Sequence, residues 1–360
     1  MGSDLDMTGN IVKKAITDLK SSRIPPLSDN SSPLTDNDGR LILSYYRFIP
    51  GKKISINEHS HGMEKRFLAY FGHVNIDVSL RVGSLPTSGS VKVDSVSENF
   101  GGTAGNFALV SSRLGFTFDL YAAVSQKTHE SYLKKLGEIG VRTDHIFIDN
   151  SLAGPMCYLV SDGSDQIAYV VQGPMESWRP SFGFKGEEYE YVHLSTGPAS
   201  EYIKIAEKAH GKSKVVFDPS QELSYNYDRN SVLEMLACTD VFIGNSHEMD
   251  VLRDKFGIPL QELTQMGVQV IVTHGKDGSK FYSRDTEFSV PSFNAGTPRD
   301  TTGAGDSFRA GLYLGLFRKL QMRNSLAIGS VVAAHAITGR IVDFMPDIPL
   351  ILRESDALVR

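Results

Sequence analysis

Cysteine is scarce in this chain, which has only Cys157 and Cys238 among its 360 residues. Two distant cysteines in apolar stretches provide neither a disulfide framework nor a CxxC pair, so we expect a reducing, cytoplasmic location. Positive charge is not in excess, because the formal net charge is −5, and this argues against a nucleic-acid partner. No apolar run is long enough to span a bilayer, and we expect neither a signal peptide nor a membrane partner.

Two common phosphate-binding motifs are also missing. No GxxxxGK[ST] segment occurs, which argues against a P-loop kinase. The first predicted strand, 66–71, runs into Gly72-His73-Val74-Asn75 rather than a GxGxxG turn, which argues against a dinucleotide-dependent dehydrogenase.

What the chain does contain is a regular alternation of strand and helix patterns from residue 66 onward. Buried strands are predicted at 66–71, 118–122, 191–194, 214–217, 240–244 and 268–273. This order predicts an α/β fold with a mainly parallel sheet covered on both faces. Residues 1–65 are expected to form a partly flexible N-terminal extension, with a short helix at 11–19 and no assigned role, before a domain spanning 66–360.

Alternating apolar and polar residues predict a second, smaller sheet. The pattern occurs at 78–82, at 88–97 and across 155–172, where Asp162-Gly163 supplies a hairpin turn. We expect the segments 78–99 and 155–172 to form a small β-lid over a ligand.

The most informative stretch is Asp300–Gly311, in which a Gly303-Ala304-Gly305 turn opens directly onto an apolar helix. Free backbone N–H groups and the positive end of the helix dipole converge at such a point, which makes an anion site. Asp306 at the mouth of that site would repel an anion, but it is well placed to take a proton from an attacking hydroxyl. The alternative is that Asp306 only caps the helix.

A second glycine turn enters a helix at Gly101-Gly102 and places Asn106 in the first helical turn. Asn75 and Asp77 stand two residues apart after the first strand, so their side chains leave the same face of an extended chain. An amide and a carboxylate at the edge of an α/β sheet suit the hydroxyls of a ligand, although both residues are also common in turns.

Asn245 and Glu248 follow the strand 240–244 at a spacing that has two interpretations. An amide and a carboxylate within one helical turn suit the water shell of Mg²⁺. The same spacing is typical of a helix N-cap with an acidic residue at its third position.

Taken together, these motifs resemble the ribokinase-like (PfkB) family of carbohydrate and nucleoside kinases. The resemblance covers roughly residues 66–350 and rests on an ordered set of motifs. The set comprises Asp77, Gly101-Gly102 to Asn106, Asn245-x-x-Glu248, Thr273-x-Gly275-x-x-Gly278, and Asp300 to Asp306. Membership implies a three-layer α/β/α fold with a β-lid, and an ATP-dependent kinase that transfers the γ-phosphoryl group to a hydroxyl.

The resemblance also implies roles for individual residues. Asp306 would be the general base, with Gly303, Ala304 and Gly305 as the anion hole. Acceptor hydroxyls would be held by Asn75, Asp77, Gly101, Gly102 and Asn106. ATP would be bordered by Asn245, Thr273, Gly275, Gly278 and Thr302, and Mg²⁺ organised by Asn245 and Glu248. A K⁺ site near Asp300 and Thr302, and a homodimer paired through the lid, are further features of some members.

The chain departs from the family pattern at two positions. Thr103 stands where ribokinases carry a lysine, which weakens an assignment to ribose alone. Arg309 occupies a first-turn position where small residues are common, and it would either contact phosphate or face outward. We therefore expect a kinase for a ribose- or fructose-like sugar, with a nucleoside kinase as the alternative and a catalytically silent sugar-binding homologue as the third hypothesis.

Overall fold

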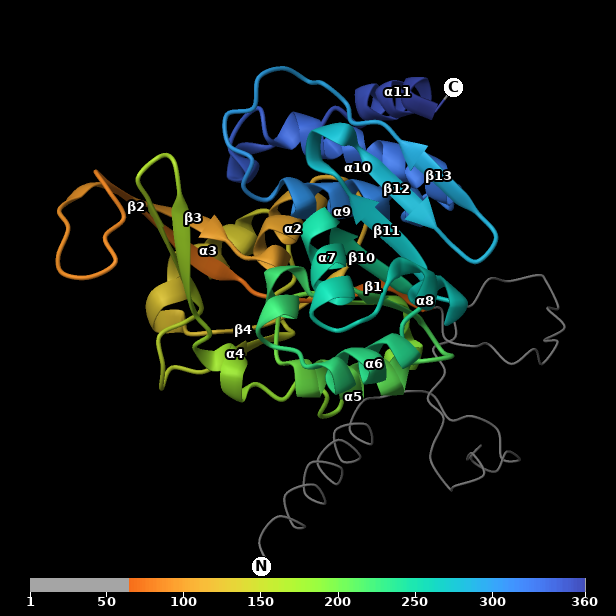
Figure 1. Cartoon of the computed structure of the whole chain (residues 1–360), viewed down its shortest axis with the longest axis horizontal. Coiled ribbons are helices and arrows are strands. Elements are labelled where there is room, and N and C mark those ends of the chain that lie inside the picture. The colour runs from red at the N-terminus through yellow and green to blue at the C-terminus, as the bar shows by residue number, and fades with distance from the viewer. Residues whose placement is uncertain (1–64, 360) are drawn as a thin grey trace, which may run out of the picture. The chain divides into compact units, whose positions relative to one another are not determined.

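The computed structural model describes residues 65–359, so the expected N-terminal extension and its helix at 11–19 lie outside the described residues. The described part contains one large and one small sheet (Figure 1). The large sheet has nine strands in the order β13-β12-β11-β10-β9-β8-β1-β4-β5. Strands β11 to β5 in this order pair in parallel, and β12 and β13 complete one edge as an antiparallel pair.

The strands of the large sheet are short and apolar, as strands buried on both faces are. Their bounds are β1 Arg66–Phe71, β4 Asp119–Val124, β5 Ile146–Ile148, β8 Tyr189–Leu194, β9 Lys214–Phe217, β10 Val241–Asn245, β11 Gln269–Thr273, β12 Ser279–Tyr282 and β13 Glu287–Val290. In β1, Leu68 and Tyr70 enter one hydrophobic core, whereas Ala69 and Phe71 enter another. The sheet therefore separates two apolar cores, as predicted for a three-layer α/β/α fold.

Helices cover both faces of the sheet. One face carries α2 Thr103–Ser111, α3 Gln126–Glu138, α9 Ala304–Phe317, α10 Met322–Ala336 and α11 Ile348–Val359. The other carries α4 Pro174–Ser177, α5 Ala199–Ala209, α6 Arg229–Ala237, α7 Ser246–Asp254 and α8 Leu260–Gln265. In Figure 1, α9 and α10 lie above the sheet, and α5 and α6 lie below it. Four short 3₁₀ helices are η1 Gly186–Glu188, η2 Ser220–Ser224, η3 Gly275–Asp277 and η4 Ile341–Asp343.

The small sheet is the predicted lid, and its strand order is β3-β2-β6-β7. Its strands are β2 Asn75–Val82, β3 Val93–Gly101, β6 Met156–Ser161 and β7 Gln166–Val171. The hairpin across 155–172 is confirmed, and β6 pairs in parallel with β2. The lid strands project at one end of the molecule in Figure 1.

Several predicted boundaries were wrong. The second lid strand begins at Val93 rather than at 88 and continues to Gly101, because every residue from Ser95 to Gly101 pairs with β2. Asn75 and Asp77 belong to lid strand β2 and do not end the core strand β1. The helix after Gly102 ends at Ser111, and β5 spans only Ile146–Ile148. Within residues 65–359, no helix is long and apolar enough to cross a membrane.

Candidate active site

The turn before α9 has the geometry of an anion site. Gly303 is the N-cap residue with φ 73°, and a Cβ atom there would lie 2.3 Å from Ile341 Cδ1, so only glycine fits. The Ala304 N–H donates to the Thr301 carbonyl at 3.1 Å. In the described part of the chain, no protein acceptor meets the N–H groups of Gly303, Gly305 and Asp306. These three donors, rather than all of Gly303 to Gly305, are available to an anion at the positive end of α9.

Asp306 stands at the third position of α9 and does not cap it, since the N-cap is Gly303 and makes no side-chain bond. Its Oδ2 atom accepts a 2.9 Å hydrogen bond from Asn106 Nδ2. Burial is the main reason why the Asp306 pKa rises to about 7. Asp218 and Asp77 add to the rise, whereas Arg309 and the bond from Asn106 oppose it. A carboxyl with this pKa is suited to accept a proton near neutral pH.

Asn106 is held by the Gly101–Gly102 turn. Gly102 is the N-cap of α2 with φ 83°, and Asn106 lies buried in the first turn of that helix. A Cβ on Gly101 would lie 1.9 Å from the Asp77 carboxylate, so the paired glycines let the turn pack directly against Asp77. Tyr132 also holds the turn in place, because its hydroxyl donates to the Gly101 carbonyl at 3.1 Å.

A polar cavity of about 290 Å³, which we call the lid cavity, lies between the lid and the turn before α9. It is lined by Asp77, Ser79, Asn99, Phe100, Asn106, Leu159, Arg299, Asp300, Thr302, Gly339, Arg340, Ile341 and Val342. Burial and the nearby Asp300 carboxylate raise the Asp77 pKa to about 6. Asn75 does not line the cavity, but its Oδ1 atom is buried and has no partner within residues 65–359.

A larger and more apolar cavity of about 540 Å³, the loop cavity, opens on the other side of the same turn. Its lining residues are Thr273, Gly275, Lys276, Gly278, Ser292, Phe293, Asn294, Ala295, Gly296, Pro298, Thr301, Ala304, Gly305, Phe308, Ser330, Ala333, Ala334 and Ile337. The structure thus brings together three residues predicted for the nucleotide, Thr273, Gly275 and Gly278, with the anion turn. Thr302, which was predicted to lie with them, lines the lid cavity instead.

Sequence reasoning did not identify the apolar wall of the loop cavity. Ala333, Ala334 and Ile337 come from the end of α10 and the residue after it, a segment that reads in the sequence only as a buried helix. The run of small residues was the available signal, since alanine leaves room for a ligand where larger side chains would fill the space. Arg299 and Arg340 in the lid cavity were also missed, because each follows a loop without a recognisable motif.

Asn245 and Glu248 form the capping box that their spacing allowed. Asn245 Oδ1 accepts from the Glu248 N–H at 2.9 Å, while Glu248 Oε2 accepts from the Asn245 N–H at 2.7 Å. Asn245 Nδ2 also donates to Glu248 Oε1 at 2.9 Å. Burial raises the Glu248 pKa, with Arg309 acting in the opposite direction. Both residues offer hard oxygen atoms, but neither lines the two cavities directly.

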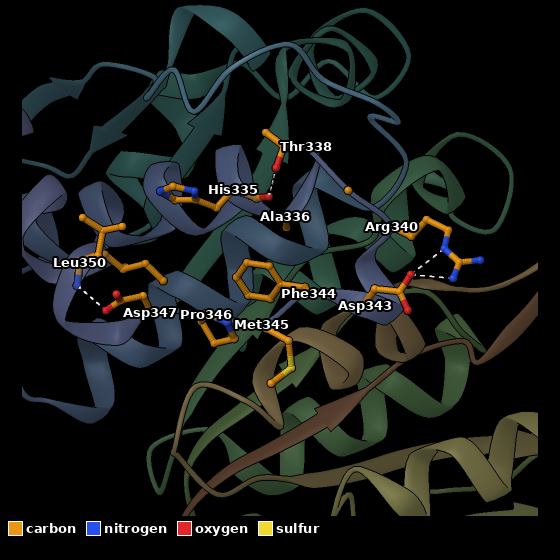
Figure 2. Close-up of a pocket in the computed structure, with 12 residues that line it drawn as sticks. His335, Ala336, Thr338, Arg340, Asp343, Phe344, Met345, Pro346, Asp347 and Leu350 are labelled. Carbon is orange, nitrogen blue, oxygen red and sulfur yellow. Dashed lines mark hydrogen bonds and ion pairs between the residues drawn. The ribbon is translucent and has the colours of Figure 1, made fainter.

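The loop at residues 299–302 is tied to the end of α10. The N–H groups of Arg299 and Asp300 both donate to the Ile337 carbonyl, at 2.8 and 3.4 Å, and Asp300 Oδ1 accepts from the Thr302 N–H. A separate hollow of about 340 Å³ lies beyond this loop, against α11 (Figure 2). There Arg340 and Asp343 point toward each other and form an ion pair, and no predicted site residue lines the hollow.

Comparison with known proteins shows which family this chain belongs to. Residues 65–346 match the model of the pfkB family carbohydrate kinases. The chain belongs to the pfkB family. This pfkB-family protein is therefore a kinase, a phosphotransferase whose acceptor is an alcohol group, and the ribokinase-like fold predicted from the motifs is confirmed.

Three similar proteins show how far the relationship extends. A protein from Thermoplasma acidophilum named nucleoside kinase is 40% identical over 291 residues, which are 81% of this chain and 96% of that one. A crystal structure of a candidate ribokinase from the same organism is 39% identical, with a TM-score of 0.73, and covers 82% of this chain and 99% of its own. A nucleoside kinase from Burkholderia thailandensis in complex with ADP-inosine has a TM-score of 0.71 over 81% of this chain and 95% of its own, and at 20% identity it shows the fold alone.

Proposed function

We propose that this protein is an ATP-dependent nucleoside kinase in which Asp306 is the general base. One observation carries the proposal: the turn from Asp300 to Asp306 separates two cavities. Thr301, Ala304 and Gly305 line the loop cavity, whereas Asp300 and Thr302 line the lid cavity. A group that must pass from one bound molecule to another would cross at this turn, where Asp306 and the free N–H groups lie.

The loop cavity suits ATP. Its apolar wall on α10 fits an adenine ring, and its Thr273–Gly278 border and the α9 N-terminus fit the polyphosphate. Asn245 and Glu248 would hold Mg²⁺ through its water shell, since this ion is usually bound by few protein ligands together with water and phosphate. When bound, Mg²⁺ neutralises charge on the phosphate oxygens. A K⁺ ion at the 299–302 loop stays part of the proposal, and activity in KCl against choline chloride tests it.

We infer the transfer step from the positions of Asp306 and the free N–H groups. The ionised Asp306 carboxylate takes the proton of the acceptor hydroxyl as its oxygen forms a bond to the γ-phosphorus. The bond from that phosphorus to the bridging oxygen of ATP breaks, and ADP leaves with the electron pair. The free N–H groups of Gly303 and Gly305 stabilise charge on the transferred group, and the lid excludes water from it.

Two observations support a nucleoside as the acceptor. The 40% identical relative is named nucleoside kinase, which favours the alternative acceptor over a simple sugar. A hollow of about 500 Å³ adjoins the lid cavity and shares Asn99, Phe100, Arg340 and Val342 with it. A bare ribose or fructose would leave this hollow empty, whereas a nucleoside would place its base there and its ribose hydroxyls near Asp77 and Asn106, which line the lid cavity.

An acceptor panel with ATP and Mg²⁺ tests the proposal. We expect kcat/KM for inosine or adenosine to exceed that for ribose and fructose by about 100-fold or more, because a sugar makes none of the contacts that a base would make in the hollow. A preference for ribose would support the sugar alternative instead. Asp306→Asn should lower kcat by about 10²–10⁴ while ATP still binds. Equal turnover in the two proteins would rule out Asp306 as the base, and binding without any transfer would support a silent homologue.

The lid face that points away from the lid cavity supports a homodimer. Strand pairing places Leu80, Val96, Val160 and Ile167 in one row across the lid, and Tyr158 and Tyr169 in the next. Val96 and Tyr169 are 62% and 58% exposed, so this is an apolar surface on a thin sheet. We assign it to pairing with the lid of a second copy. A cytoplasmic location also stays a proposal, supported by two free cysteines.

A further inference from the structure

Arg309 lies one helical turn beyond Asp306 on α9, and it neither faces outward nor lies free. The residue is 7% exposed, and its Nε and Nη2 atoms each donate at 2.6 Å to a different oxygen of Asp218. Bidentate pairs of this kind are strong and geometrically specific. Asp218 directly follows β9 and is itself buried, so the pair joins the end of that strand to the helix that carries the predicted base.

The Asp218 carboxylate is fixed in turn by buried aromatic residues. His193 Nε2 lies 3.1 Å from Asp218 Oδ2, and His193 Nδ1 lies 2.9 Å from the Tyr313 hydroxyl. The Tyr70 ring stacks on His193, with ring centroids 4.2 Å apart. Burial lowers the His193 pKa, with Asp218 acting in the opposite direction, and Arg309 is the cation that donates from two nitrogens to Asp218. The bidentate bonds to this fixed carboxylate therefore hold the guanidinium in one orientation.

The guanidinium lies next to the anion turn. A Cβ atom on Gly305 would lie 2.8 Å from Arg309 Nη1, the nitrogen that Asp218 does not bind. The same cation opposes the rise in pKa of two carboxyls on different elements, Asp306 and Glu248. Its positive charge thus faces the turn, the proposed base and the proposed Mg²⁺ region together.

We propose that Arg309 is a positioning residue for phosphoryl transfer: clamped by Asp218, it supplies a fixed positive charge beside Gly305, one helical turn from Asp306. Desolvating two charges makes a buried ion pair a weak device for stability alone, which favours a role at the site it faces. The inference rests on the proposed role of Asp306 as general base.

Asp306 is surrounded by charged and titratable groups from five parts of the fold, and all of them enter its pH dependence. They are Arg309 on α9, Asp218 after β9, Asp77 on β2, and the buried hydroxyls of Tyr70 on β1 and Tyr132 on α3. Of these groups, only Arg309 carries positive charge. Removal of Arg309 takes a positive charge away from the surroundings of Asp306, whereas removal of Asp218 takes a negative charge away. Both substitutions nevertheless break the same ion pair.

The pH profile of kcat/KM, with ATP as donor and inosine as acceptor, provides the test, with ribose replacing inosine if the panel favours the sugar. The acid limb of this profile is the fall in kcat/KM at low pH. We expect the midpoint of the acid limb to rise by about one pH unit in Arg309→Met and to fall in Asp218→Asn. Arg309→Lys, which keeps the charge, should keep the limb near the parent position. Limbs that do not move, or that move in the same direction in Arg309→Met and Asp218→Asn, overturn the proposal.

A matched control separates this effect from loss of stability. Arg66 pairs at 2.7 Å with the fully buried Asp119 at the other end of the parallel strands, so Arg66→Met removes an ion pair to a buried carboxylate away from the site. The Arg66 side chain is 43% exposed and Arg142 also pairs with Asp119, so this is a milder change than the loss of Arg309. It should lower the melting temperature and leave the acid limb in place, and a displaced limb in this variant would also overturn the proposal. If Arg309→Met does not fold, Asp218→Asn alone decides, since an unmoved or raised limb contradicts the expected fall.

Failure of this inference differs from failure of the proposed function. Full activity in Asp306→Asn would rule out Asp306 as the general base, and with it the proposed role of Arg309. An inactive Asp306→Asn together with unshifted limbs in the Arg309 and Asp218 variants would remove only the role of Arg309.

Discussion

Asn106 Nδ2 donates a 2.9 Å hydrogen bond to Asp306 Oδ2 across 200 residues of sequence. The bond joins the first turns of α2 and α9, so each of the two glycine motifs contributes one of its two partners. An amide donor stabilises the ionised carboxylate, which is why this bond opposes the effect of burial on the Asp306 pKa. The acceptor motif thereby influences the protonation of the proposed base.

The first prediction concerns pH. Burial raises the Asp306 pKa to about 7, and a base must be ionised, so kcat/KM should be lost as pH falls through about 7. Asn106→Ala removes the donor and should move this acid limb upward by about one unit. Steady-state rates from pH 5 to 9 measure both effects. A parent profile that stays flat down to pH 5 would contradict the Asp306 pKa, and a limb that moves downward in Asn106→Ala would contradict the role of the bond.

The second prediction concerns the backbone at Gly303. Gly303→Ala forces φ 73° on a residue with a side chain and drives its Cβ toward Ile341, so we expect a loss of about 1–3 kcal/mol in unfolding free energy. Urea denaturation measures it. The control is Gly137→Ala on α3, where a Cβ meets nothing within 4 Å and φ is not positive. This control should gain about 0.5–1 kcal/mol, and equal stabilities for the two variants would contradict the account.

Local patterns were sufficient to predict most elements of the fold. The alternation across 155–172, with Asp162-Gly163 as its turn, predicted the β6–β7 hairpin, because a hairpin pairs residues that are close together in the sequence. The strand from Val93 was misjudged because its pairing with β2 is what decides where it starts, and pairing is not visible in the alternation. The alternation of apolar and polar residues is also weak where lid side chains are exposed, so it does not show where those strands pair.

The parts of the site that are built from continuous motifs could be predicted from the sequence, whereas the parts built from distant residues could not. Gly303 to Asp306 are adjacent in sequence, so their convergence at one helix terminus follows from the chain itself. The partner of Arg309 is 91 residues away and could be found only in three dimensions. Thr302 belongs to the same motif as Ala304 and Gly305, yet it lines the lid cavity, whereas they line the loop cavity.

The third prediction concerns assembly. Tyr169 is 58% exposed on the edge strand β7 of the apolar lid face, so Tyr169→Glu should convert a dimer into a monomer by placing a charge in the proposed interface. Light scattering coupled to gel filtration reads the mass directly. Phe182→Glu is the matched control, because Phe182 is 94% exposed and lies outside the lid strands. A monomeric parent, or a dimer that persists in Tyr169→Glu, would contradict pairing through the lid.

The fourth prediction separates a nucleoside from a sugar as the acceptor. Phe100 lines both the lid cavity and its adjoining hollow, and its ring stacks on Tyr132 with centroids 4.3 Å apart. Its place between the two spaces is where a base would meet the protein, while the ribose hydroxyls would lie at Asp77. Phe100→Leu keeps an apolar side chain but removes the ring, so it should raise the KM for inosine by about 10-fold and change kcat little.

The same variant should leave the KM for ribose almost unchanged, because a bare sugar has no group to place in the hollow. Asp77→Asn is the complementary variant, since it alters the hydroxyl contact that both acceptors would share, and it should raise both KM values together. Unequal effects of Phe100→Leu on the two acceptors support a nucleoside. Equal effects would show that Phe100 acts through the fold of the Gly101 turn, and the acceptor would then be decided by the panel alone.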